Sequence, residues 1–548
     1  MRKLPIGIDD FKELREQNYF YADKSLWIHH LLEDGAKVTL FTRPRRFGKT
    51  LNMSMLHYFF DVKNSEENRN LFNGLKIEKS MHILEQGKFP TIFISFKDLR
   101  LNSWEECLIK VINLLLRCFL EHEDLYNSLS KMKKIRYDLF INRSADAAWD
   151  DALKVLSEYL EAYYQKKVVI LIDEYDTPLI YAYQYGYYDK AVSFFRNLYS
   201  AALKSNTSLH KGIMTGITRV AKEGIFSGLS NLTVDTILST KYADFFGITE
   251  DELQSAVEEY QIPDSIGDIR KWYNGYRFGN VEIYNPWSIL NYLKTGQLSA
   301  YWINTSANTE INQILDISDE SVFLDLDKLL AGNTLTKYIY KEMTFESLRD
   351  QKKLWTLLLN SGYLTVTDTS SQDGYYRLRI PNQEILSFFK ENFIERFIGL
   401  DNAHLPQLLK SLKSKTITGK NSFESALKSI FLSKISYFDA AGRESFYHGF
   451  MICLSLLFQS EYIAISNIES GSGRPDLVLE PRDKKNPGII LEFKIAGNKK
   501  ELEQAAESAL AQIENEKYSA FLQERGVEDI LAIGIAFCGK ELCIKRRI

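Results

Sequence analysis

Residues 37–50 read KVTLFTRPRRFGKT, an apolar strand-like run followed by a loop that contains glycine and lysine. The loop leads into LNMSMLHYFFD (51–61), which has a helical pattern. The glycine, lysine and threonine at 48–50 match the end of the phosphate-binding pattern GxxxxGK(S/T). In that pattern backbone N–H groups hold phosphates, the lysine reaches the β- and γ-phosphates and the threonine ligates Mg²⁺. Arg43 replaces the first glycine and Pro44 follows it, so we expect a differently built loop.

An acidic pair stands at the tip of a second apolar run, KKVVILIDEYD (166–176), where Asp173 and Glu174 follow the buried residues. In P-loop ATPases such an Asp joins the Mg²⁺ shell, and the adjacent Glu polarises the attacking water. Acidic residues also end strands that have no such role. The order of the surrounding elements is therefore needed to choose between the two interpretations.

Strand-like and helical runs alternate through the N-terminal half of the chain. After the loop helix come FPTIFISF (89–96), a helix at 103–120, the Asp-Glu strand, HKGIMTGITRV (210–220) and LTVDTIL (232–238). This alternation predicts a parallel α/β sheet. An extra strand between the loop strand and the Asp-Glu strand is the order expected of additional-strand P-loop ATPases.

Further polar residues lie near the predicted phosphate site. Thr215, near the tip of the fourth strand, is a candidate contact for the γ-phosphate. Arg219 is a candidate transition-state arginine, acting in cis or from a neighbouring protomer, or a solvated residue that starts a loop. Arg45 and Arg46 could bind phosphate or cover the surface beside the loop.

A different constellation lies near the C-terminus. Asp476 opens the run DLVLE, a turn-rich PRDKKNPG follows, and the next run is IILEFKI. Two such runs joined by Asp, Asn, Pro and Gly predict a hairpin. Side chains alternate along a strand, so Glu492 and Lys494 share a face, with Asp476 roughly opposite. Two carboxylates and an ammonium on one sheet can hold Mg²⁺ and position a water for phosphodiester attack, although an ordinary amphipathic strand could show the same triplet.

This arrangement resembles the PD-(D/E)XK nuclease superfamily. The resemblance implies that Asp476 and Glu492 are metal ligands and that Lys494 orients the nucleophile and offsets charge on the phosphorane. It also implies a supporting carboxylate at Glu444, in the helix RESFYHGFMICLSLLF before the hairpin. Gln512, in the following ALAQIENEKY helix, would complete the core.

The N-terminal half resembles the AAA-ATPase-like family of bacteria and archaea, whose members often carry a C-terminal PD-(D/E)XK domain. The shared segments are RPRRFGKT, YADKS (21–25), LIDEYDTPL and GITRVAKEGIFSGLSNL. The family itself has arginine at the first glycine position. The resemblance spans residues 5 to about 310 and about 440–545. It implies that ATP and Mg²⁺ are bound by Asp173, Glu174 and the loop residues Arg43, Pro44, Arg45, Arg46, Phe47, Gly48, Lys49 and Thr50, with Lys49 on phosphate and Thr50 and Asp173 on the metal ion.

The middle of the chain predicts helices and aromatic packing. In TEDELQSAVEEY (249–260), Thr249 and Glu252 have the spacing of a capping box, which starts a helix. The aromatic-rich run at 271–293 could form a lid or a stacking surface for nucleic acid. We prefer the interpretation that it packs against the ATPase core.

Residues 351–397 predict a helix, a hairpin and a second helix, which resembles a winged-helix module. The polar stretch at 409–425 predicts a hinge. The expected domains are an ATPase-like domain (1–245), a helical subdomain (246–345), a winged-helix-like module with the hinge (346–425) and a restriction-endonuclease-like α/β domain (426–548).

Composition limits the remaining choices. The 548 residues, with 45% hydrophobic and 26% charged, fit a soluble globular protein of about three or four domains. A formal charge of −4 predicts that any nucleic-acid surface is local. The five cysteines lack a CxxC pair, and three of them lie in apolar helical runs, which indicates a reducing cytoplasm. We expect no signal peptide and no membrane helix, because no apolar run reaches ~20 residues.

The leading hypothesis is an ATP-regulated, metal-dependent nuclease that acts on nucleic acid, with DNA preferred over RNA. A second hypothesis is a nucleotide-driven switch whose nuclease-like domain only binds nucleic acid or a protein partner. A third is an ATPase fold that keeps ATP as a structural ligand. Assembly into a homo-oligomer, and a role in defence, mobile-element biology or repair, are open expectations.

Overall fold

The chain divides into two compact units. They are Met1–Ile314 with Thr334–Ile385, and Leu315–Asn333 with Leu386–Ile548. The structure is a computed structural model that describes residues 1–204, 206–218, 231–262, 265–302, 320–330, 332–341, 351–368, 373–397, 405–434, 447, 458, 461–465 and 475–547. The finer division into four domains stays a prediction.

A five-stranded parallel sheet in the order β2-β3-β4-β1-β5 forms the centre of the first unit. Its strands are β1 (Val38–Thr42), β2 (Thr91–Ser95), β3 (Val168–Asp173), β4 (Leu209–Gly216) and β5 (Leu232–Asp235). The prediction of a parallel α/β sheet is confirmed. Along the chain, β2 lies between β1 and β3. In the sheet, β4 lies between β1 and β3, and β2 pairs with the other side of β3.

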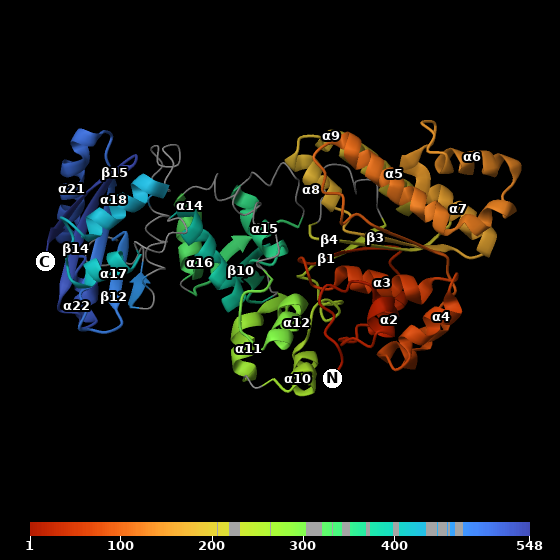
Figure 1. Cartoon of the computed structure of the whole chain (residues 1–548), viewed down its shortest axis with the longest axis horizontal. Coiled ribbons are helices and arrows are strands. Elements are labelled where there is room, and N and C mark those ends of the chain that lie inside the picture. The colour runs from red at the N-terminus through yellow and green to blue at the C-terminus, as the bar shows by residue number, and fades with distance from the viewer. Residues whose placement is uncertain are drawn as a thin grey trace. The chain divides into compact units, whose positions relative to one another are not determined.

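Helices cover both faces of this sheet because its central strands are apolar on both sides. One face carries α2 (Leu26–Glu33), α3 (Lys49–Phe60) and α4 (Ser65–Arg69), and the other carries α5 (Trp104–Glu121), α6 (Lys131–Ile141), α7 (Ala152–Tyr164), α8 (Thr177–Gln184) and α9 (Tyr188–Leu203) (Figure 1). Short elements are α1 (Phe11–Glu16), η1 (Asn70–Phe72), η2 (Lys76–Lys79), η3 (Met81–Glu85), η4 (Glu123–Ser128) and η5 (Trp149–Asp151).

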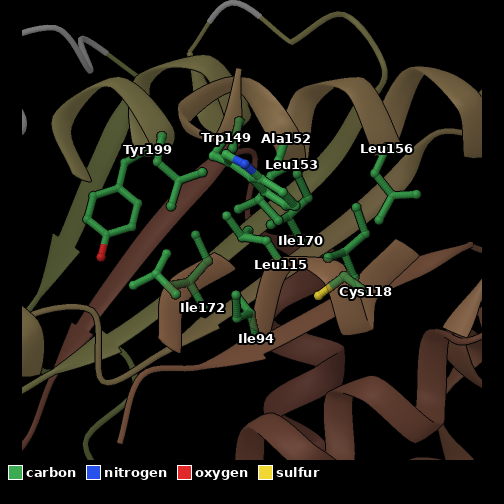
Figure 2. Close-up of a cluster of buried hydrophobic side chains, with 14 of the residues drawn as sticks. Ile94, Leu115, Cys118, Trp149, Ala152, Leu153, Leu156, Ile170, Ile172 and Tyr199 are labelled. Carbon is green, nitrogen blue, oxygen red and sulfur yellow. The ribbon is translucent and has the colours of Figure 1, made fainter. Parts of the chain in front are cut away.

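The main core lies between the sheet and α5, α7 and α9. Figure 2 shows the strand residues Ile170 and Ile172 in one cluster with side chains from the helices, among them Leu115 and Leu153. Each buried aliphatic side chain of this size contributes about 1.5–3 kcal/mol. Cys118 is part of this core, and Cys107 is as well, as expected for small apolar residues in helical runs.

The helical middle region begins at α10 (Glu250–Tyr260), and the predicted capping box is confirmed. Thr249 Oγ1 accepts from the Glu252 N–H (3.5 Å), and Glu252 Oε2 accepts from the Thr249 N–H (2.9 Å). The next elements are α11 (Ile266–Tyr273), β6 (Tyr276–Phe278), β7 (Val281–Ile283) and α12 (Pro286–Thr295). Most of the aromatic side chains at 271–293 are buried, and Tyr276 and Phe278 pack on Phe47 of the first part of the chain, as the packing interpretation predicts.

A small antiparallel sheet in the order β8-β10-β9 follows. Its surroundings contain the predicted succession of helix, hairpin and helix. The elements are β8 (Leu335–Tyr338), η8 (Gln351–Lys353), α15 (Leu354–Asn360), β9 (Thr365–Val366), β10 (Tyr375–Arg379) and α16 (Gln383–Phe397). The boundary between the two units falls within the first turn of α16, so this helix continues from the first unit into the second.

The second unit contains a mixed five-stranded sheet in the order β11-β12-β13-β14-β15, in which only β13 and β14 are parallel. Its elements are α14 (Glu320–Leu330), α17 (Leu405–Lys413), α18 (Phe423–Lys434), β11 (Tyr462–Ile465), β12 (Leu477–Pro481), β13 (Gly488–Ile495), η9 (Lys499–Glu501), α21 (Leu502–Asn515), α22 (Ala520–Glu524), β14 (Ile530–Cys538) and β15 (Glu541–Arg547). The α/β fold class expected here is confirmed.

Close packing of α21 on this sheet requires glycine at one position. A Cβ atom on Gly534 would lie 2.4 Å from the Ala506 carbonyl oxygen and 2.6 Å from the Leu510 nitrogen. The helix backbone can therefore approach β14 more closely than any side chain would permit. This approach brings the next turn of α21 towards the strands that carry the C-terminal acidic residues.

The polar stretch at 409–425 contains the end of α17, the connection at 414–422 and the start of α18, and Leu412, Ile417 and Phe423 within it are buried. The hinge proposed there stays a prediction. Among the described residues, no helix combines the length and the apolar character that crossing a bilayer requires.

Candidate functional site

The phosphate loop joins β1 to α3. Gly48 has a left-handed backbone conformation (φ 80°) directly before Lys49, the first residue of α3. Glycine adopts this conformation without strain, which explains why it stands here. The N–H groups of the first helical turn have no partner within the helix, so this terminus favours an anion.

The Lys49 side chain lies within the curve of the loop. Its Nζ donates to the carbonyl oxygens of Arg43 (3.1 Å) and Pro44 (2.9 Å), and only 5% of the residue is exposed. Burial lowers the pKa of Lys49, while the nearby Glu174 and Asp173 act in the opposite direction. Bonds to two carbonyl groups hold the ammonium where a phosphate on the loop could replace them.

Asp173 is the centre of a group of hydroxyl donors. Its carboxylate accepts hydrogen bonds from Thr50 Oγ1 (2.9 Å), Ser95 Oγ (3.1 Å) and Thr215 Oγ1 (2.5 Å), and Asp173 is fully buried. Burial raises the pKa of this carboxyl, and the Thr215 and Thr50 hydrogen bonds oppose the rise. The structure thus brings together three of the predicted residues. Ser95 was missed, although its place at the tip of the neighbouring strand was a usable signal.

Glu174 continues the site one residue further along the chain. Its backbone is left-handed (φ 51°), its N–H lies 3.3 Å from Thr215 Oγ1, and its Oε2 accepts from Thr177 Oγ1 at 3.0 Å. Asp176, which the sequence analysis did not select, is buried and accepts from the N–H groups of Ile217 (2.8 Å) and Thr218 (3.0 Å). These bonds fix the chain that leaves β4 beside the acidic pair. Arg219, the candidate transition-state arginine, lies outside the described residues.

The Arg43 side chain is committed to contacts within the protein. Its Nη2 lies 2.5 Å from Asp235 Oδ1 at the end of β5, and its Nη1 donates to the Thr42 and Asp235 carbonyl oxygens (2.9 and 3.2 Å). The guanidinium is fully buried and lies over the rings of Phe246 and Phe278, at 4.9 and 5.4 Å. These contacts anchor the start of the loop to β5 and engage this side chain within the protein.

The rest of the loop packs on four aromatic residues of the middle region, here called the aromatic collar: Tyr276, Phe278, Trp287 and Trp302. The Phe47 ring lies 5.0 Å from Tyr276 and 5.1 Å from Phe278. The Arg46 guanidinium lies over Trp287 at 4.0 Å, and its Nη1 is buried without a hydrogen-bond partner. Trp302 Nε1 donates to the Arg45 carbonyl oxygen at 3.2 Å. The positions of Pro44, Arg45, Arg46 and Phe47 therefore depend on a part of the chain more than 200 residues away.

A buried carboxyl group in the first turn of α16 holds the collar in place. Glu384 Oε1 accepts from the N–H groups of Tyr301 (2.6 Å) and Trp302 (2.8 Å), and Oε2 accepts from Ser288 Oγ (2.8 Å). Glu384 has no exposed surface, and burial raises its pKa to about 7. No local sequence pattern marks this residue, because its partners lie 82 to 96 residues away.

In the second unit the hairpin of β12 and β13 brings the predicted acidic residues together. Leu477 pairs with Leu491, so Asp476 lies beside Glu492. The Asp476 N–H is 3.3 Å from Glu492 Oε2, and Asp476 Oδ2 accepts from the Phe493 N–H at 2.7 Å. Glu492 is 3% exposed, and burial together with the Asp476 charge raises its pKa to about 8. Two acidic groups thus lie side by side at the neighbouring strands β12 and β13.

A basic and an amide side chain complete this group. Lys494 Nζ donates to Gln512 Oε1 on α21 at 2.7 Å, and Gln512 Nε2 is 3.3 Å from the hydroxyl of the buried Tyr518. Tyr518 was not selected from the sequence; it lies in the turn that follows α21, six residues after Gln512. Glu444 lies outside the described residues.

The donor atoms of both groups suit a hard divalent cation. Mg²⁺ prefers oxygen ligands, and each group offers them: Thr50 and Asp173 beside the loop, Asp476 and Glu492 on the hairpin. Two carboxyl groups in contact repel each other when both are ionised, and a cation between them removes that repulsion. The residues present therefore fit the metal ions that such folds generally use.

The fold and these two constellations define a P-loop ATPase-type unit followed by a nuclease-type unit. Residues 5–226 match the AAA-ATPase-like family, described as predicted AAA-ATPase, and residues 442–547 match the PD-(D/E)XK nuclease superfamily. The chain thus carries one domain of each kind. It is also similar to the "Uncharacterized protein in vnfD 5'region" of Azotobacter chroococcum mcd 1, with 28% identity over 405 residues, which cover 72% of this chain and 71% of that protein. Together the two domains support a nucleotide-dependent, nuclease-type activity.

Proposed function

We propose that this protein binds and hydrolyses ATP at the phosphate loop and cleaves phosphodiester bonds of nucleic acid, with DNA as the preferred substrate, at Asp476, Glu492 and Lys494. The observation that supports cleavage most directly is the convergence of these three side chains, with Gln512 bonded to the lysine. A surface that only binds phosphates gains nothing from buried carboxylates, which repel them.

In the proposed cleavage reaction Asp476 and Glu492 would hold a divalent ion, which would supply Lewis-acid activation of water and of the phosphate. Lys494 orients the attacking water and offsets the charge that develops on the phosphoryl oxygens. Gln512 Oε1 accepts from Lys494 and limits the positions of its flexible side chain. Its own amide is held near Tyr518, so the ammonium is oriented before the substrate arrives.

At the nucleotide site Lys49 would exchange its bonds to loop carbonyls for bonds to the β- and γ-phosphates. Thr50 and Asp173 would hold Mg²⁺, which neutralises phosphate charge. Glu174, with Oε2 fixed by Thr177, would orient the water that attacks the γ-phosphate. Thr215 touches both Asp173 and the Glu174 backbone, so it can respond to the state of either residue.

The aromatic collar offers a route by which the nucleotide controls the rest of the chain. A nucleotide that moves the loop must also move or break the bond from Trp302 to Arg45, and Trp302 is held in turn by Glu384. Glu384 lies in the first turn of α16, the helix that continues into the second unit. We assign the coupling of ATP to cleavage to this succession of contacts.

A cleavage assay on the full chain tests the proposal. The protein is incubated with single- and double-stranded DNA and with RNA, in Mg²⁺ or Mn²⁺, with and without ATP. Wild-type protein should cleave at least one of these substrates, and Asp476→Asn and Lys494→Met should abolish cleavage. Asp483→Asn is the matched control, because Asp483 is an exposed carboxylate in the turn of the same hairpin.

The nucleotide arm of the experiment uses Lys49→Ala and Glu174→Gln. Phosphate release should fall to the background level in both variants, and ATP should no longer change the rate of cleavage. If no substrate is cleaved but ATP still changes nucleic-acid binding, the protein is a nucleotide-dependent switch instead. We also propose a biological role in defence, mobile-element biology or repair. The measured substrate preferences would help to choose among these three roles.

A further inference from the structure

Three side chains with metal-binding atoms lie together in the first unit, apart from the nucleotide site. His29 and Glu33 are one turn apart on α2, and His82 comes from η3. One ligand atom of each residue lies within 4.8 Å of those of the other two. His82 Nε2 is 2.5 Å from Glu33 Oε1, and the rings of His29 and His82 are 5.2 Å apart.

Contacts outside this group fix the backbone that carries it. Asp23 Oδ2 accepts from the Lys76 N–H at 2.7 Å, and Ser25 Oγ accepts from the Ile77 N–H at 3.1 Å. Ile77 is fully buried. These bonds tie η2 to the start of α2, so the histidines and the glutamate are not required to hold the two segments together.

Ser80 connects both histidines. Its Oγ accepts from the His82 N–H at 3.1 Å, which caps η3, and lies 3.0 Å from Nδ1 of His29. In the tautomer in which His29 Nδ1–H donates to Ser80, the Nε2 lone pair of His29 is available to a ligand. Hydrogen bonds of this kind orient the histidines of metal sites and select the binding nitrogen.

We propose that His29, Glu33 and His82 bind one divalent transition-metal ion of the zinc type, with water completing its shell. Two imidazole nitrogens and one carboxylate oxygen suit Zn²⁺, Co²⁺ or Ni²⁺, whereas Mg²⁺ prefers oxygen ligands alone. Metal–ligand distances near 2.1 Å place tetrahedral ligands about 3.4 Å apart, so shifts of about 1 Å are sufficient. The Glu33 side chain is 55% exposed, which leaves room for water.

An ion at this site would link η3 to α2 through shared metal ligands. Helix α2 directly precedes β1 and the phosphate loop. A ligand that binds only the folded state raises the unfolding temperature. The alternative is that His82 and Glu33 form an ordinary surface ion pair, which would contribute little to the stability of the fold. Metal binding by the purified protein separates the two interpretations.

The experiment uses the full chain without an affinity tag, stripped of metal with a chelator and kept in excess Mg²⁺ to fill sites that have only oxygen ligands. Co²⁺ is titrated first, because tetrahedral nitrogen coordination gives it strong visible absorption, and Zn²⁺ is then added as a competitor. Wild-type protein should bind one equivalent of Co²⁺, which Zn²⁺ displaces, and its unfolding temperature should rise with Zn²⁺. His29→Gln and His82→Gln should lose both responses.

Two controls make the result specific to this site. His30→Gln changes the next residue of α2, whose ring packs against Phe245, and Asp476→Asn removes the proposed metal ligand of the second unit. Both should bind Co²⁺ as the wild type does. If either histidine variant does not fold, Glu33→Gln decides, since Glu33 lies on the surface. Retention of the full Co²⁺ equivalent by the ligand variants, or no binding by the wild type, overturns the proposal whether or not the protein is a nuclease.

Discussion

Replacing Glu384 with glutamine should stabilise the first unit at alkaline pH and change little at acidic pH. Glutamine has the shape of the protonated carboxyl group and does not titrate. Its oxygen can accept from the Tyr301 and Trp302 N–H groups as Glu384 Oε1 does, and its NH₂ can donate to Ser288 Oγ. The variant therefore keeps every contact of the acid form.

The size of the effect follows from the pKa of the Glu384 carboxyl, which burial raises from 4.5 to about 7. A shift of about 2.5 units corresponds to roughly 3 kcal/mol. The folded state binds the proton more tightly than the unfolded state, so this contribution is complete below pH 4.5 and is lost as the pH rises through 7. Above pH 7 the wild type carries the full cost of a buried carboxylate, and the glutamine variant does not.

Scanning calorimetry of the full chain at a series of pH values measures this difference. The unfolding temperature of Glu384→Gln minus that of the wild type should be near zero at about pH 4 and grow to several degrees at about pH 8. The subtraction removes the titration of all other groups. Glu384→Ala should be less stable at every pH, because it leaves three donors without an acceptor, at a cost of about 1–3 kcal/mol each. A constant difference across this range would refute the argument.

Three further substitutions test contacts that position the two sites. Asp235→Ala should destabilise the first unit by about 3–5 kcal/mol in thermal unfolding, because Arg43 would remain buried and unpaired; wild-type stability would contradict the proposed anchor. Trp302→Phe removes the hydrogen bond from the indole N–H to the phosphate loop, which is worth about 1 kcal/mol. This variant should lose most of the ATP-dependent change in tryptophan fluorescence. An unchanged fluorescence signal would exclude Trp302 from the coupling route. Gln512→Leu should slow cleavage about tenfold without weakening nucleic-acid binding, because it removes only the acceptor that orients Lys494. Equal losses in cleavage rate and in binding affinity would show that Gln512 has a different role.

Local patterns were sufficient for much of the fold. The alternation of apolar runs predicted the parallel sheet, the spacing of Thr249 and Glu252 predicted a helix start, and the turn residues after DLVLE predicted the hairpin that joins Asp476 to Glu492. Each of these signals acts over a few residues. The same kind of reasoning did not anticipate that Leu412, Ile417 and Phe423 of the polar stretch at 409–425 are buried.

Residue types at the strand tips and at the helix start can be read directly from the chain, and they define the chemistry that is available to the protein. The surroundings of these residues depend on the folded arrangement: Arg43 bonds to Asp235, and Glu384 holds Trp302 against the phosphate loop. These partners are 82 to 257 residues apart along the chain. Hydrogen bonding and burial depend on distances in space, not on separation along the chain. A periodic pattern in the sequence therefore cannot predict contacts that form only when distant segments pack together.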